Sequence, residues 1–285
     1  VLYQAYNEQD EARFIADVLN DWMNKGGSYE EAAVLYRSNA QSRAIEEALL
    51  RVSIPYRIYG GLRFYERLEI KNAIAYLKVI FNNSDNPSFE RSISNPTRGV
   101  GEKTLAKIRN AAKQYNISYI KASAKLIDEG SISGRGGSGL RDYLEFIAGC
   151  KSFIEENLLS ELMELIIKES GLYAYHAKEP GEKGKTRTEN LEELITATKN
   201  FEQSIEEEIS NIEVAEKYLD IISLDSGDRQ ASEHDDAAQL MTMHSAKGLE
   251  FKLVLLTGLE ESLFPHGRSM AVSYTHLRAH ETACY

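Results

Sequence analysis

Apolar residues in the first part of the chain follow two kinds of spacing, that of strands and that of helices. Residues 1–6 alternate apolar with polar side chains, and 32–36 (AAVLY) and 54–59 (IPYRIY) are short apolar runs of strand length. Helical spacing covers 11–24 and 41–51 between these runs. This order of strand, helix, strand, helix and strand predicts a parallel sheet with helical crossovers.

A long helical stretch follows the Gly60-Gly61 pair. Apolar residues recur there at intervals of three and four positions, and strand-like runs return only at 240–243 and 253–257. The last two runs are continuous, so we expect strands buried on both faces. The sequence therefore predicts an α/β fold in which a parallel sheet, formed by residues 1–61 and 236–271, is interrupted by a large all-helical insertion at 62–235.

A short polar segment joins the last two predicted strands. His244, Lys247 and Glu250 recur there at every third position, so a single helical turn would project all three from one side. We expect the segment at the carboxyl edge of the sheet, where ligands bind in such folds. Taken alone, three polar residues are more often a solvated loop face, so a binding role needs support from other motifs.

Three glycine-rich segments differ in what they predict. Residues 133–139 (SGRGGSG) follow no strand and are interpreted as a flexible surface loop. Residues 181–186 (GEKGKT) resemble the end of a phosphate-binding P-loop, but Glu179 stands where that motif needs glycine and helical spacing precedes it. We reject a nucleotide site there and expect a polar loop between helices.

The third segment, Asn95 to Thr104 (NPTRGVGEKT), precedes residues at helical spacing. Gly99 and Gly101 allow a close approach of the backbone to a partner, and a helix N-terminus offers free N–H groups. Lys103 lies beside them. The segment thus suits the phosphates of DNA, as in helix-hairpin-helix elements.

Charge is unevenly distributed along the chain. The formal net charge is −11, but residues 189–236 contain fifteen acidic residues against three basic ones, so the remainder is close to neutral. Between 97 and 113 the balance is reversed, and local patches decide where a polyanion binds. The basic residues of that segment, opposed only by Glu102, are Arg98, Lys103, Lys107, Arg109 and Lys113.

The remaining composition excludes several protein classes. No apolar run reaches the length of a membrane span, and residues 1–13 lack the layout of a signal peptide. The two cysteines, Cys150 and Cys284, form neither a metal-binding spacing nor a disulfide framework, which indicates a reducing, cytoplasmic setting. We expect no membrane association and no metal site within the chain.

Together these motifs resemble the superfamily 1 DNA helicases of the UvrD, Rep and PcrA type, with PcrA-like the nearest description. The similarity covers about residues 1–270. The matching strings are VLYRSNAQSR (34–43), YGGLRFYERLEIKNAIAYL (59–77), NPTRGVGEKTL (95–105), RTENLEEL (187–194), LMTMHSAKGLEF (240–251) and GLEESLFPH (258–266).

The resemblance implies that the interrupted sheet is the second of two RecA-like motor domains. Glu250 would bind the ribose of ATP, which the parent protein would use with Mg²⁺ in the cleft between its motor domains. Single-stranded DNA would contact the turn after the second predicted strand and the segment after the fourth. By position, these residues are Arg37, Asn39, His244, Lys247 and, as a weaker candidate, His266.

The helical insertion would be an accessory domain that binds duplex DNA. By resemblance, the duplex contacts are Thr97, Gly99, Gly101, Lys103 and Thr104. Implied partners are single- and double-stranded DNA, the first RecA-like domain, and proteins of DNA repair or replication. The implied location is the bacterial cytoplasm, in association with the nucleoid.

Departures from the family pattern limit the expected activity. The Walker A lysine, the Walker B carboxylates and the arginine that reaches the γ-phosphate have no counterpart in this chain. Residues 272–285 fit nothing in the family and are interpreted as a non-native tail. We expect that the chain alone neither hydrolyses ATP nor unwinds DNA.

Two other readings remain open. The chain could be a stand-alone duplex-binding module that uses the Gly99 segment, with the sheet as scaffold. The acidic residues of 189–236 could form a protein-docking surface, although a run of charge is more often a solvated face.

Overall fold

The computed structural model describes residues 2–59, 61–225 and 235–259. The chain divides into two compact units, and the second is a continuous insertion into the first. The first unit contains Val1–Gly61 and Gln230–Tyr285, and the second contains Leu62–Arg229. In the described part of the chain, every helix is too short or too polar to cross a lipid bilayer.

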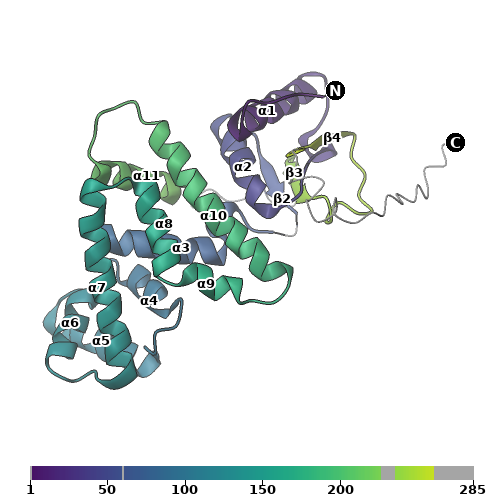
Figure 1. Ribbon diagram of the computed structural model, residues 1–285. Coiled ribbons are helices and arrows are strands. Elements are labelled where there is room, and N and C mark those ends of the chain that lie inside the picture. The colour runs from purple at the N-terminus through teal and green to yellow at the C-terminus, as the bar shows by residue number, and fades with distance from the viewer. Residues whose placement is uncertain (1, 60, 226–234, 260–285) are drawn as a thin grey trace, which may run out of the picture. The chain divides into compact units, whose positions relative to one another are not determined.

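The first unit contains a four-stranded sheet in which all strands are parallel (Figure 1). Its strand order is β2 (Tyr56–Ile58), β3 (Ala238–Thr242), β1 (Ala32–Tyr36) and β4 (Leu253–Leu256). β3 pairs with both β1 and β2, so residues on either side of the helical insertion belong to one sheet. The predicted α/β fold with a parallel sheet is confirmed.

Two helices, α1 (Glu8–Asn24) and α2 (Ser42–Arg51), cover one face of this sheet. Strand side chains alternate between faces, so every second residue of β1 points toward these helices. Val34 and Tyr36 are fully buried in the resulting core. The helices contribute to it Ala12, Ile15, Ala16, Leu19, Ala44, Ile45 and Leu49.

The predicted first strand, residues 1–6, is wrong. Residues 2–5 have no regular structure and pair with no described strand. Tyr6 is 97% exposed, and Tyr3 stacks on Phe14 with 3.9 Å between ring centroids. The helix that follows begins at Glu8 instead of the predicted residue 11, because the Asn7 side chain accepts a hydrogen bond from the backbone N–H of Asp10 at 2.9 Å and caps it.

β4 also differs from its prediction, because it is buried on only one face. Val254 is 47% exposed and Leu256 is 51% exposed, whereas Leu253 and Leu255 pack against the core beneath α1 and α2. β4 is an edge strand, and no described helix covers the face that carries Val254. A continuous apolar run therefore did not indicate burial on both sides.

The second unit is built from helices, as predicted. Its apolar residues at helical spacing fill one continuous core, which includes Ile70, Leu162 and Leu191. The helices in chain order are α3 (Leu68–Phe81), α4 (Asn86–Ser94), α5 (Glu102–Tyr115), α6 (Tyr119–Asp128), α7 (Gly134–Glu156), α8 (Leu159–Glu169), α9 (Leu172–Ala177), α10 (Glu182–Gln203) and α11 (Asn211–Asp225).

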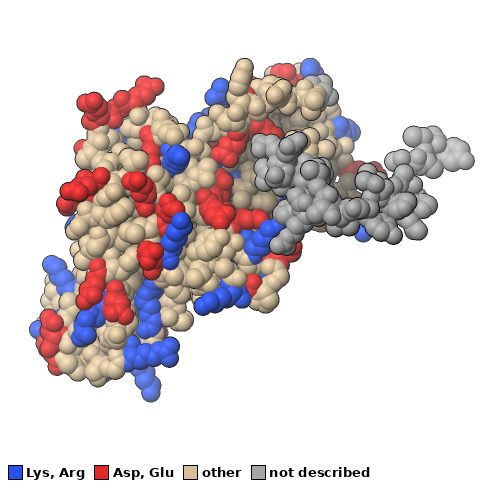
Figure 2. Space-filling view, in the orientation of Figure 1, with Lys and Arg blue, Asp and Glu red and all other residues tan. Residues whose placement is uncertain are grey.

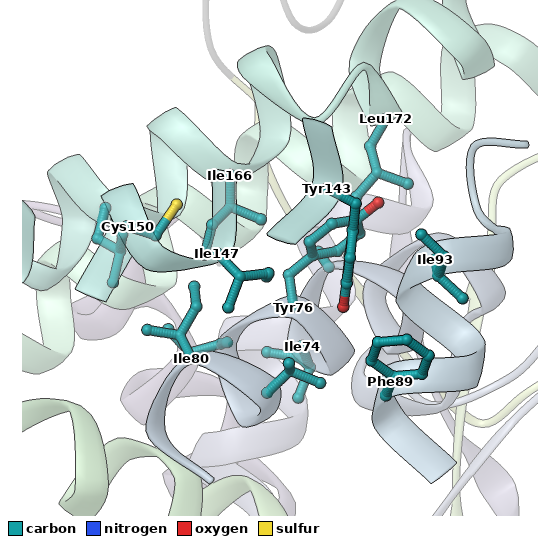
Figure 3. Close-up of a cluster of buried hydrophobic side chains, with 14 of the residues drawn as sticks. Ile74, Tyr76, Ile80, Phe89, Ile93, Tyr143, Ile147, Cys150, Ile166 and Leu172 are labelled. Atoms are coloured by element: carbon teal, nitrogen blue, oxygen red, sulfur yellow. The ribbon is translucent and has the colours of Figure 1, made fainter. Parts of the chain in front are cut away.

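Aromatic side chains from α3, α4 and α7 occupy the centre of this core (Figure 3). The Tyr143 ring meets that of Phe89 edge to face at 5.5 Å, and Tyr76 lies 6.0 Å from Tyr143. Burial raises the pKa of Tyr76 to about 12 and that of the Cys150 thiol to about 12. Cys150 is thus a packing residue and not a reactive thiol.

Two glycine-rich segments predicted as loops are largely helical. Residues 134–139 form the start of α7, and α10 begins at Glu182 within the GEKGKT segment. The helices α8 and α9 precede that segment, which agrees with the rejection of a P-loop because a P-loop follows a strand.

A partly buried polar network holds α10 against neighbouring elements. The Arg187 guanidinium lies 2.5 Å from the Glu179 carboxylate and 3.6 Å from that of Glu69. Fully buried His176 donates to Glu179 through Nδ1 at 2.6 Å. Hydrogen bonds from His176 and Arg187 lower the pKa of Glu179. The charges in this network are therefore paired.

Candidate nucleic-acid interface

The polar turns predicted to bind ligands lie at the carboxyl edge of the sheet. Tyr36 ends β1 and pairs in register with Thr242, which ends β3. The N–H of Met243 donates to the carbonyl of Tyr36 at 2.9 Å, so the segments after the two strands start side by side. Parallel strands thus bring together turns about 200 residues apart in the sequence.

Arg37 and His244 are in direct contact at this edge. The Arg37 Nη1 lies 3.3 Å from Nδ1 of His244. Because a guanidinium can only donate, the His244 ring accepts at Nδ1 and carries its proton at Nε2. Asn39 follows in the same turn and is partly buried. The structure therefore places the Arg37 and His244 side chains next to each other at this edge.

The segment after β3 is a turn and not a continuous helix. The N–H groups of Ser245 and Ala246 both donate to the Thr242 carbonyl, at 2.9 and 3.2 Å. Gly248 then has φ +85°, which interrupts any helical continuation. A single helical turn that carries His244 through Glu250 is therefore not present.

The three side chains of this segment are nonetheless accessible. His244, Lys247 and Glu250 are all exposed. Among the described residues, neither Lys247 nor Glu250 forms an ion pair or a hydrogen bond through its side chain, so a donor and an acceptor are available to a ligand. No group of acidic, histidine or cysteine side chains in the described ranges is arranged to hold a metal ion.

Gln41 organises the turn after β1, and the sequence analysis missed it. Its Oε1 accepts from the N–H groups of Arg37 and Ser38, both at 2.9 Å. The Ser38 side chain completes a capping box with this residue. Gln41 also packs closely against Gly258, just beyond β4. The spacing Ser-x-x-Gln at 38–41 is a recognised signal for this arrangement.

The second predicted interface is a helix-hairpin-helix formed by α4, residues 95–101 and α5. Gly99 has φ +75°, a backbone conformation that favours glycine, and Gly101 is the N-cap of α5 without a side-chain hydrogen bond. Thr97, Gly99, Gly101 and Lys103 are exposed, and Thr104 is partly buried. The loop therefore presents backbone and positive charge at its surface.

Not all basic residues of this region are available to a partner. Arg98 is turned inward, where its guanidinium donates to the carbonyls of Pro96 and Ser170 at 2.9 and 2.8 Å and lies over the Tyr76 ring. Arg109 pairs with Glu90 and Glu102 at 2.5 Å.

Lys103 and Lys113 differ from those two residues. Both are exposed, and neither has an ion-pair partner among the described residues. The charge that residues 97–113 can offer a polyanion is therefore smaller than the sequence suggests.

Two predictions fall outside the described residues. These are the weaker single-strand candidate His266 and the non-native tail at 272–285.

Comparisons with known proteins agree with these motifs. Residues 1–132 and 141–281 match the UvrD-like helicase C-terminal domain, and the match extends into the segment predicted as a non-native tail. The chain is 45% identical over 269 residues to DNA helicase II of Escherichia coli strain K12, and 38% identical over 270 residues to ATP-dependent DNA helicase PcrA of Leuconostoc citreum. Both alignments cover 94% of this chain but only 37% and 36% of these relatives.

Proposed function

This chain belongs to the family of UvrD-like helicase C-terminal domains, and we propose that it is part of an ATP-dependent DNA helicase that moves along single-stranded DNA and unwinds duplex DNA. The helicase relatives extend well beyond the aligned region, which is little more than a third of their length. The motor activity is therefore proposed for a longer parent protein, in which this chain supplies the second RecA-like domain and its helical insertion.

The contact between Arg37 and His244 is the observation that carries the single-strand part of the proposal. These side chains come from separate turns, yet lie 3.3 Å apart at the carboxyl edge of the sheet. Exposed Lys247 follows on the same turn as His244. Guanidinium, imidazole N–H and ammonium groups are donors that suit phosphate oxygens, so this edge is a candidate path for a single strand.

Glu250 is the proposed ribose ligand for ATP. Its carboxylate is exposed and unpaired among the described residues, so it can accept hydrogen bonds from ribose hydroxyl groups. In the parent protein, ATP bound with Mg²⁺ would supply the free energy for movement, and the phosphates would contact the other motor domain. Glu250 would hold the nucleotide by its sugar.

The nucleotide and DNA contacts are proposed to be coupled through the turn after β3. Glu250 is three residues from Lys247 and six from His244, so cleft closure around ATP would shift all three residues. A ligand changes a conformational equilibrium when it binds one state more tightly than the other. Nucleotide binding would therefore change the affinity for single-stranded DNA.

The helix-hairpin-helix loop is proposed to contact duplex phosphates. The exposed glycines at 99 and 101 leave the backbone accessible, and Lys103 supplies an unpaired positive charge. Such contacts position a protein on DNA without reading its sequence.

Lys247→Ala tests the single-strand role. We expect weaker binding to single-stranded oligonucleotides of every sequence, with the salt dependence of log Kd reduced by about one unit because one phosphate contact is lost. Fluorescence anisotropy over a range of salt concentrations measures both quantities.

Lys25→Ala is the matched control. Lys25 is exposed and directly follows α1. It lies in the connection to the start of β1, which is at the opposite edge of the sheet from Lys247. Equal effects of the two substitutions would contradict a specific role for Lys247. If Lys103→Ala abolishes DNA binding while Lys247→Ala leaves it unchanged, the chain acts as a stand-alone duplex-binding module.

A further inference from the structure

The glycine-rich start of α7 lies directly against the helix-hairpin-helix loop. A Cβ atom at Gly139 would lie 2.0 Å from the Arg98 carbonyl oxygen, and one at Gly136 would lie 3.0 Å from that of Gly99. Both separations are shorter than an ordinary van der Waals contact. The loop can therefore approach α7 this closely only because Gly136 and Gly139 have no side chain. The segment that the sequence suggested was a free loop is therefore a support for the loop at 95–101.

Arg135, immediately before Gly136, extends across the same loop. Its Cγ lies 3.0 Å from the position that a Cβ atom at Gly99 would occupy, and its Cδ and Nε lie 3.4 and 3.5 Å from it. The residue is exposed and has no ion-pair or hydrogen-bond partner among the described residues. Its hydrocarbon stem thus rests on the loop, and its charge is available to a ligand.

The surroundings of Arg135 are positively charged. Exposed Lys103 lies in the first turn of α5 beside the loop, and the Lys107 ammonium donates to the Ser131 carbonyl at 2.9 Å just before α7. Glu102, the one acidic residue of 97–113, is paired with Arg109. Figure 2 shows Lys and Arg side chains projecting from the lower edge of the helical unit, where Figure 1 places α5.

We propose that Arg135 is a further phosphate contact for duplex DNA, so that the duplex-binding surface combines the loop at 95–101 and the first turn of α5 with the start of α7. This inference rests on the proposed function of that loop and extends it to a second segment. A guanidinium in this position can donate two hydrogen bonds to one phosphate. It would add affinity without sequence preference.

Arg135→Ala in the full chain tests the inference by fluorescence anisotropy with a short blunt duplex. We expect Kd to increase roughly three- to tenfold at low salt and the salt slope to fall by about 0.9, the value for one lost phosphate contact on duplex DNA. Arg135→Lys should retain the slope, because it keeps the charge, and lose part of the affinity.

Lys151→Ala is the matched control, because Lys151 is exposed on the same helix and lies sixteen residues further along it. Lys103→Ala tests separately whether the helix-hairpin-helix loop binds duplex DNA. If Lys103→Ala weakens duplex binding while Arg135→Ala behaves like Lys151→Ala, the inference on Arg135 is overturned and the role of the loop stands. If the unmodified chain does not bind the duplex, both fail. Circular dichroism confirms that each variant is folded.

Discussion

Single residues of the same charge have different roles within the helix-hairpin-helix region. Lys103 is exposed at the start of α5, whereas Arg98 donates to three backbone carbonyls and lies over two tyrosine rings. The sequence predicts a basic segment, but it cannot tell which of its members face solvent, because that depends on packing with residues far away in the chain. Arg98 is therefore a structural anchor and not a DNA ligand.

The ion pairs of Glu179 predict a pH-dependent stability. Its folded-state pKa is below the ordinary value of 4.5, so its contribution to stability is present above about pH 4.5 and is lost as the pH falls through the lowered pKa. Glu179→Gln should reduce the free energy of unfolding by roughly 1–2 kcal/mol at pH 7, because a carboxylate between His176 and Arg187 is lost. Urea denaturation at several pH values measures this.

Glu182→Gln is the control for that measurement, since Glu182 is exposed in the first turn of α10. The difference in stability between wild type and Glu179→Gln should shrink below pH 4. A difference that stayed constant down to pH 3 would show that the charge of Glu179 is not its cause.

Among whole elements, α7 shows where local propensity failed. Four glycines in its first six residues favour a loop by intrinsic preference. Packing reverses that preference, because the glycines allow contact with the loop at 95–101 and the rest of the helix buries Leu140, Tyr143 and Ile147 in the core. Tertiary contacts of this kind are not visible in a single sequence.

Two glycines of α7 are expected to respond oppositely to alanine. Gly139→Ala should destabilise the protein by about 1–3 kcal/mol, because the added methyl group overlaps the Arg98 carbonyl. Gly149→Ala should stabilise it by up to about 1 kcal/mol, because the added Cβ would have no atom within 4 Å outside the neighbouring residues and backbone of its own helix, and alanine favours the helix. Thermal unfolding of both variants measures the effects, and changes of the same sign would contradict the described packing.

Strands were predicted well where they are central and poorly at the margins of the sheet. β1 has the predicted bounds because AAVLY is buried between two neighbouring strands. Residues 1–6 have the alternation of a strand but no partner, and β4 has the apolar run of a buried strand but only one covered face. The spacing of apolar residues shows that a segment is able to form a strand, but pairing with a neighbouring strand decides whether it does.

For the molecule as a whole, the sequence predicted the fold class and the all-helical character of the insertion. Long periodic segments such as α3 and α10 give strong signals, and the return of apolar runs at Leu240 indicated that the sheet resumes. At the candidate interface, motifs predicted Arg37, His244 and Lys247 as ligands of single-stranded DNA, and this remains a prediction. They did not predict Gln41 or Arg135, whose proposed roles rest on their closeness to Gly258 and Gly99.

The chain alone is expected to lack DNA-stimulated ATP hydrolysis. Its sequence contains no complete P-loop motif, so nothing in it supplies the phosphate-binding lysine. Fusion to the preceding motor domain of a close relative, with the arginine motif for the γ-phosphate restored, should produce activity that single-stranded DNA stimulates. A coupled assay of phosphate release measures this.

The same fusion carrying Glu250→Gln is the informative comparison, because it should raise the KM for ATP more than it lowers kcat. An inactive fusion that is correctly folded would argue against the motor assignment. ATPase activity of the unfused chain would contradict the expected dependence on a second domain.

The position of the insertion bears on how such a protein could have arisen. β2 and β3 are parallel neighbours, with Tyr56 opposite Ala238. A parallel pair always requires a crossover of a dozen or more residues, so the helical unit occupies a connection that any ancestor of this sheet already needed. Lengthening a connection costs little chain entropy, and strand pairing is untouched. A gene could thus have acquired the whole helical unit by expansion at one site, without any reordering of the ancestral strands.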